Sequence, residues 1–133
     1  MESKPVTVIH RASIVNEGRA FTGYVAVEGE FITAVGEGEA PAELIAGADS
    51  VVDAAGRLLL PGIIDTHVHF RDPGLTHKAD MATESLAAVA GGVTSFIDMP
   101  NTRPATVSTE AVEAKMRRAS EVSLANYGFF IGA

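Results

Sequence analysis

Strand-like and helix-like segments alternate after Pro61, and this alternation limits the possible folds more than any other feature of the sequence. The strand-like segments are residues 62–70, 93–99 and 127–131, and the helix-like segments are residues 79–90 and a segment that starts near Ser108. Alternating helices and continuously apolar strands are typical of a parallel sheet covered by helices. We therefore expect an α/β fold in residues 61–133.

The number of strands bears on how much of such a fold is present. A (β/α)8 barrel needs roughly 250 residues, whereas the chain has 133. We therefore expect an incomplete (β/α)8 TIM-type barrel with its first two to three βα units. A third strand that stops at residues 129–131 would leave an uncovered sheet edge, so we also expect the chain to be a piece of a longer protein.

The last helix-like segment has its own expected pattern. Ser108 or Thr109 can act as its N-cap, and its apolar face is expected to hold Val112, Met116 and Ala119. Three basic residues follow in what we expect to be its later turns, where positive charge interacts favourably with the helix dipole. These residues are Lys115, Arg117 and Arg118.

Residues 1–60 have a different pattern. Short β-prone segments alternate there with turn residues such as Asn16-Glu17-Gly18 and Glu28-Gly29. No cluster of reactive side chains lies among them. We expect a small β-rich N-terminal domain over residues 1–60, followed by the start of the barrel over residues 61–133.

Composition excludes several classes of protein. Hydrophobic residues make up 47% of the chain and charged residues 20%, which indicates a globular protein. The net charge of −7 argues against a nucleic-acid or anionic-membrane surface. Cysteine is absent, which excludes disulfides and thiolate metal sites. No apolar run is long enough for a membrane span or signal core, so we expect a cytoplasmic protein without nucleic-acid or membrane partners.

The strongest functional motif is Asp65-Thr66-His67-Val68-His69, at the end of the first barrel-type strand. Side chains alternate along a strand, so Asp65, His67 and His69 share one face and both imidazoles can bind one divalent ion. Asp65 could accept a hydrogen bond from a ligating histidine or orient the strand. The alternative is two ordinary polar histidines, but barrel enzymes gather function at the C-terminal ends of strands, which favours a metal site.

Two further residues are candidates for binding an anionic substrate. Arg71 follows the histidine strand, and a guanidinium suits paired hydrogen bonds to a carboxylate. The alternative is a surface ion pair of Arg71 with Asp72 or with a neighbouring carboxylate. Asn101 follows the second strand and could offer its amide nearby, although asparagine is also a common turn residue. For Asp98, at the end of the same strand, we favour a packing role.

Residues 61–74, PGIIDTHVHFRDPG, and 87–104, AAVAGGVTSFIDMPNTRP, resemble the dihydroorotase family of the amidohydrolase superfamily. The resemblance implies that His67 and His69 bind zinc, as one or two ions per full site. It also implies that Arg71 and Asn101 bind the carboxylate of dihydroorotate or carbamoyl-aspartate. The family's other ligands and its general acid/base would lie downstream, because neither His10 nor His77 matches a ligand position.

The implied activity is the metal-dependent, reversible hydrolysis of the cyclic amide of dihydroorotate to carbamoyl-aspartate in pyrimidine biosynthesis. The implied partners are a small anionic substrate, further copies of the chain, and aspartate transcarbamoylase as another candidate. A catalytic zinc site normally has at least three protein ligands, so the 133 residues alone are expected to be inactive.

Two alternatives stay open. Allantoinases and hydantoinases share the Asp-x-His-x-His strand but typically lack the combination of Arg71 and Asn101. The other alternative is a non-catalytic assembly fragment, which an exposed apolar patch at residues 129–131 would motivate.

Overall fold

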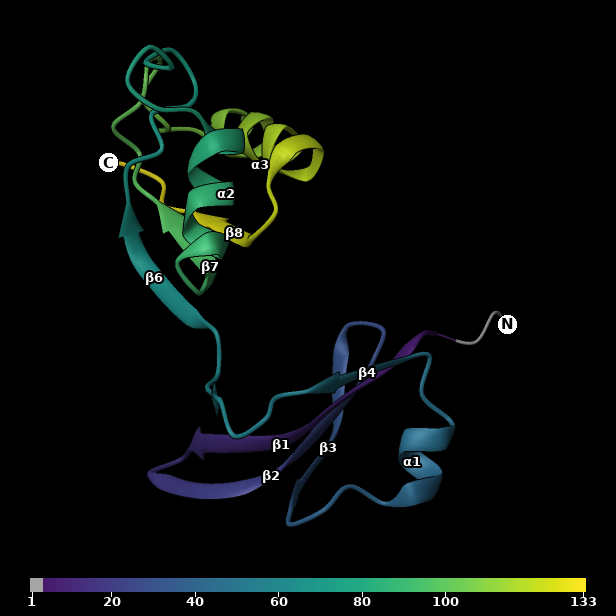
Figure 1. Cartoon of the computed structure of the whole chain (residues 1–133). Coiled ribbons are helices and arrows are strands. Elements are labelled where there is room, and N and C mark those ends of the chain that lie inside the picture. Colours follow the sequence, from purple (N-terminus) through teal and green to yellow (C-terminus); the bar gives the residue numbers. More distant parts are fainter. Residues whose placement is uncertain (1–3) are drawn as a thin grey trace. The chain divides into compact units, whose positions relative to one another are not determined.

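The structure is a computed structural model that describes residues 4–133. The chain divides into two compact units, Met1–Pro61 and Gly62–Ala133 (Figure 1). The first unit contains β1 (Val6–Asn16), β2 (Arg19–Glu28), β3 (Phe31–Glu37), α1 (Ala42–Ala46), β4 (Ser50–Asp53) and β5 (Leu58–Leu59). The second contains β6 (Ile63–Val68), α2 (Met81–Ala90), β7 (Val93–Asp98), α3 (Thr109–Val122) and β8 (Asn126–Phe129).

The first unit is a mixed sheet in the order β3-β2-β1-β4, with β5 also paired to β1. The β1-β2 and β2-β3 pairs are antiparallel, whereas β4 and β5 run parallel to β1. The tight turn between β1 and β2 uses positive φ at Glu17 (49°) and Gly18 (74°), where glycine has no steric penalty. Ala12 and Ile14 of β1, Val25 of β2 and Ala54 form a small buried core. The short helix α1 was not predicted, because five residues give too little periodicity to recognise.

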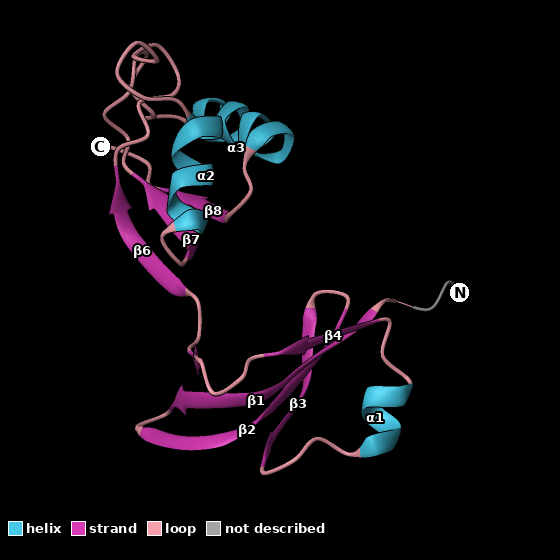
Figure 2. Cartoon of the chain, in the orientation of Figure 1, coloured by secondary structure: helices cyan, strands magenta, loops and turns pink. Residues whose placement is uncertain are grey.

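The second unit is a parallel sheet in the order β6-β7-β8, linked by α2 and α3 (Figure 2). This arrangement confirms the predicted α/β fold. Both helices contribute to the same buried cluster as the strands, so they cover the same face of the sheet. The buried residues of that cluster are Phe70, Met81, Phe96, Ala119 and Ala125.

Side-chain caps set the first residue of both helices. The carboxylate of Asp80 accepts a hydrogen bond from the Thr83 amide at 2.9 Å, so α2 starts at Met81. The hydroxyl of Ser108 accepts one from the Ala111 amide at 3.3 Å, which confirms Ser108 as a capping residue of α3. Within residues 4–133, no helix is long and apolar enough to cross a membrane.

The predicted faces of α3 were wrong in part. Met116 is 44% exposed, whereas Lys115 is buried beside Ala119. The basic residues also do not serve the helix dipole, because none lies in the last turn. Lys115 instead forms an ion pair with Asp98, and Arg118 forms one with Asp72. A pattern based on hydrophobicity cannot recognise a buried lysine that has a carboxylate partner.

Candidate functional site

The two histidines of the motif lie at the carboxyl end of β6. Val68 and Phe70 pack into the core under the helices, so the alternation of side chains places His67 and His69 on the opposite face of the sheet. Both histidines are exposed, and their ring centroids are 5.2 Å apart at an interplanar angle of 64°. The strand therefore brings the two predicted metal ligands together on an open face.

The spacing of the two rings fits a shared metal ion. An ion about 2.1 Å from one nitrogen of each ring lies roughly 3 Å from each ring centroid, and tetrahedral angles then separate the centroids by roughly 5 Å. In residues 4–133, no group of three or more metal-binding side chains is assembled. The described residues thus bring together two of the predicted ligands, and a complete zinc site needs at least one more.

Asn101 lies next to the histidine pair. Its Oδ1 is 2.8 Å from Nδ1 of His69. An amide oxygen can only accept, so the Nδ1–H of His69 donates and Nε2 carries the lone pair that a metal would bind. The sequence predicted a substrate contact for Asn101 and did not anticipate this contact with His69.

Asp65 has a local role in the structure. Its Oδ1 accepts a hydrogen bond from the backbone amide of His67 at 3.0 Å. The carboxylate thereby holds the strand backbone that carries the first histidine. This contact is compatible with orientation of the strand, and a hydrogen bond from Asp65 to a ligating histidine stays a prediction.

Asp98 anchors the ends of the strands from the helix side. Its side chain is fully buried, accepts a hydrogen bond from the Phe70 amide at 2.9 Å, and lies 2.5 Å from Nζ of Lys115. Its backbone carbonyl accepts a hydrogen bond from the Phe130 amide. A buried carboxylate needs such partners, because removing it from water is costly. Asp98 therefore has the packing role that the sequence favoured.

The loop that carries Arg71 leaves the end of β6. Asp72 forms its ion pair with Arg118 of α3, at 3.3 Å, and not with Arg71. Among residues 4–133, Arg71 takes part in no ion pair. The alternative of an Arg71–Asp72 pair is therefore wrong, and the guanidinium of Arg71 is left available.

The loops after β6 and β7 lie against each other. The Arg103 amide donates to the Pro73 carbonyl at 3.1 Å. Gly74 has φ of 84°, and a Cβ built on it would lie 1.8 Å from the Arg103 carbonyl oxygen. Only glycine fits this contact, which keeps the loops bearing Arg71 and Asn101 together.

The roles of Arg118 and Lys115 as ion-pair partners of Asp72 and Asp98 were missed. Both were interpreted as charges in the later turns of the helix that suit its dipole. The sequence gives one signal for them, their spacing of three residues, which places both on one side of α3. Their carboxylate partners lie 17 and 46 residues away, and no local pattern identifies such pairs.

Comparison with known proteins identifies the family to which the chain belongs. The dihydro-orotase-like family matches residues 56–132. The dihydroorotase of Methanosarcina acetivorans is 45% identical over 84 residues, which cover 63% of this chain and 18% of the relative. The dihydroorotase of Halobacterium salinarum is 41% identical over 118 residues, which cover 89% of this chain and 26% of the relative. The chain thus spans about a fifth to a quarter of the length of these relatives.

Solved structures give the same picture of the fold. An L-hydantoinase (dihydropyrimidinase) from Arthrobacter aurescens superposes with a TM-score of 0.86 at 24% identity, over 95% of this chain and 27% of that one. A dihydropyrimidinase from Brevibacillus agri gives a TM-score of 0.77 at 28% identity, with the same coverage. With the family match over more than half of its residues, the chain belongs to the dihydro-orotase-like family.

Proposed function

We propose that the chain is the N-terminal part of a dihydroorotase, which hydrolyses the cyclic amide of dihydroorotate reversibly to carbamoyl-aspartate. The observation that carries this proposal is the adjacency of His67, His69 and Asn101, with the free guanidinium of Arg71 on the neighbouring loop. In the whole enzyme, β6, β7 and β8 would be the first strands of a (β/α)8 barrel. Their carboxyl ends would form one wall of its active site.

His67 and His69 would hold the metal, which we propose to be zinc because the donors are two exposed imidazoles. Asn101 orients the ring of His69 through the contact at Nδ1, as outer hydrogen bonds commonly do for metal-binding histidines. A bound ion would polarise the ring carbonyl and lower the pKa of a water molecule. The remaining ligands and the general acid/base would come from segments beyond these residues.

The substrate carboxylate would bind to Arg71 and Asn101. Arg71 offers a planar cation that no carboxylate within residues 4–133 neutralises. Asn101 uses Oδ1 for His69, which leaves its Nδ2 donors for the substrate. These contacts would hold the ring amide beside the histidines and so lower the entropic part of the barrier.

A hydantoinase or dihydropyrimidinase is the second candidate. The solved structures with these names share the fold. Their substrates, as named, need no carboxylate on the ring. The two candidates therefore differ in what Arg71 would do, since a carboxylate-free ring gives this cation no partner.

The test is a specificity assay on the protein at its full natural length, loaded with zinc. We expect turnover of dihydroorotate and loss of turnover on chelation. We also expect at least a 10-fold preference over hydantoin and dihydrouracil, because a ring without a carboxylate leaves the polar groups of the site without a partner. His67→Ala should abolish turnover, whereas the matched variant His10→Ala, in the other unit, should not. Preferential turnover of hydantoin or dihydrouracil would replace this proposal by the second candidate.

A further inference from the structure

The loop after β6 is tied to α3 by one ion pair, between Asp72 and Arg118. We infer that Arg118 is a positioning residue, which acts through Asp72 to fix the turn that presents Arg71 to the substrate carboxylate. This inference rests on the proposed role of Arg71. It adds a residue on the helix side of the sheet to the determinants of substrate binding.

The backbone of Arg71 needs such support. Its φ of 64° lies in the left-handed region, which a residue with a side chain rarely adopts. A conformation of this kind costs about 1–3 kcal/mol and persists only where the surroundings impose it. The hydrogen bond from the Leu75 amide to the Arg71 carbonyl, at 3.0 Å, closes the turn from within. On either side, Phe70 is buried in the core and Asp72 is buried at the ion pair.

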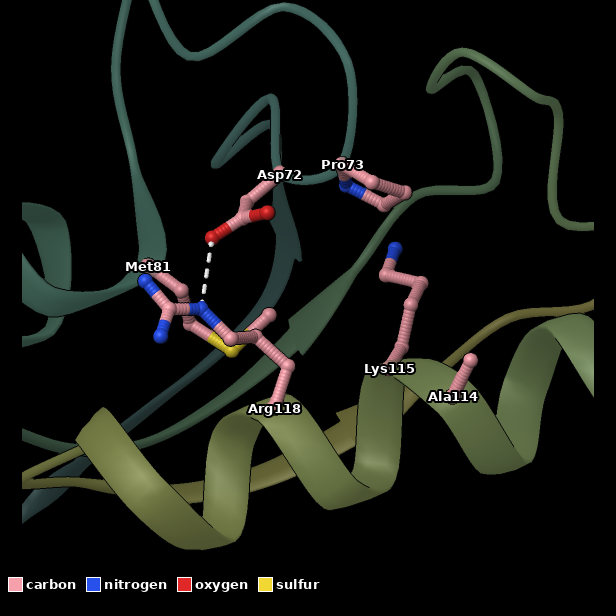
Figure 3. Close-up of a pocket in the computed structure, with 6 residues that line it drawn as sticks. All are labelled: Asp72, Pro73, Met81, Ala114, Lys115 and Arg118. Atoms are coloured by element: carbon pink, nitrogen blue, oxygen red, sulfur yellow. Dashed lines mark hydrogen bonds and ion pairs between the residues drawn. The ribbon is translucent and has the colours of Figure 1, made fainter.

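Packing alone does not hold the loop on its helix side. A cavity of about 220 Å³ separates Asp72 and Pro73 from the facing side of α3. Figure 3 shows Arg118 reaching from α3 to the Asp72 carboxylate beside this cavity. The contact from Nε of Arg118, at 3.3 Å, bridges the gap. Removing it would take away the ion pair that ties the loop to α3 across this cavity.

Arg118 also keeps Arg71 available. The Asp72 side chain is 10% exposed, and Arg118 is its only ion-pair partner among residues 4–133. Without Arg118, this poorly hydrated carboxylate would attract the nearest cation in the sequence, which is Arg71. A pair of Arg71 with Asp72 would compete with the substrate. The arginine on the helix therefore leaves the arginine on the loop free for the substrate.

A merely structural ion pair is the competing explanation. The Arg118 side chain is 45% exposed, and pairs this accessible commonly contribute little to stability. The two explanations differ in what they predict for catalysis. Loss of a structural pair would change stability and lower the apparent kcat through a smaller folded fraction, with KM unchanged, whereas loss of a positioning pair would raise KM for the carboxylate substrate.

The test compares Arg118→Gln with Arg117→Gln, whose arginine is the exposed neighbour on α3 and forms no ion pair within residues 4–133. Both variants are made in the zinc-loaded, full-length protein. For Arg118→Gln we expect KM for dihydroorotate to rise about tenfold, while kcat stays within about twofold of the parent value. The expected tenfold effect is smaller than the roughly 100-fold loss that a 1 Å displacement of a substrate can produce. Arg118→Lys should recover part of this loss, and Arg117→Gln should match the parent protein.

Hydrogen exchange at the Leu75 amide is the second measurement, because it reports the turn around Arg71 without needing activity. We expect faster exchange in Arg118→Gln and no change in Arg117→Gln. Unchanged exchange, a fall in kcat without a rise in KM, or equal effects of the two variants would overturn the inference. A parent protein that does not hydrolyse dihydroorotate would instead contradict the proposed function, and the exchange result would then decide whether Arg118 positions this turn.

Discussion

Replacing Lys115 by methionine should destabilise the Gly62–Ala133 unit by about 3–5 kcal/mol, which is the usual cost of leaving one member of a buried ion pair alone. The side chains of Lys115 and Asp98 are 2% and 0% exposed, so water screens the pair very little. After the substitution, the Asp98 side chain keeps only the Phe70 amide as a donor among the described residues. Small domains are stable by about 5–15 kcal/mol, so the variant should lose a large share of its stability.

The assay is a urea titration followed by amide NMR, because separate signals distinguish unfolding of this unit from unfolding of Met1–Pro61. The amides of Phe70 and Phe130, both bonded to Asp98, report the strand ends directly. Lys78→Met is the matched control, since Lys78 is exposed and has no ion pair within residues 4–133. It should change stability by less than about 0.5 kcal/mol.

A double variant tests the reason for the loss. Asp98→Asn combined with Lys115→Met removes the buried charge while an amide oxygen can still accept from Phe70. We expect the double variant to recover at least half of the stability lost in Lys115→Met, because neither neutral side chain leaves an unpaired charge buried. A loss below about 1 kcal/mol in Lys115→Met, or no recovery in the double variant, would refute the reasoning.

Three further predictions follow from the loops and the caps. Gly74→Ala should cost about 1–3 kcal/mol and expose the Arg103 amide to exchange, because the new Cβ would lie 1.8 Å from the Arg103 carbonyl; unchanged NMR exchange would contradict this contact. Asn101→Ala should weaken zinc binding by the full-length protein about 10–100-fold, measured by chelator competition, because His69 loses its acceptor; unaltered affinity would exclude that role. The hydrogen bond from the Thr83 amide lowers the pKa of the Asp80 carboxylate below its ordinary 3.8. Protection of the α2 amides from exchange should therefore be greatest above that pH and decline as pH falls through the folded-state pKa. Asp80→Asn should lack this pH-dependent step.

The sequence was sufficient to predict the helices and strands that have a regular apolar pattern. Apolar patterns predicted β6, α2 and β7 within a few residues, and a capping residue predicted the start of α3. The last strand was less well defined. It ends at Phe129, whereas the apolar run continues through Ile131, since hydrophobicity does not mark where hydrogen-bonded pairing stops.

Local sequence also placed the histidine pair, because the two-residue alternation of a strand requires His67 and His69 to share a face. The contacts that support them could not be predicted in the same way. The pairs Asp98–Lys115 and Asp72–Arg118 join residues far apart in the sequence, and each depends on how α3 crosses the sheet. The Asn101–His69 contact depends on the exact path of the loop after β7. These contacts arise from tertiary packing and have no period in the sequence.

The most direct test of the central claim is a crystal structure of the full-length protein grown with zinc and carbamoyl-aspartate, with anomalous scattering measured at the zinc edge. We predict an anomalous peak about 2.1 Å from a ring nitrogen of both His67 and His69, with the ligand carboxylate on Arg71 and Asn101. Zinc bound away from either histidine, or a ligand carboxylate that contacts neither Arg71 nor Asn101, would contradict the account.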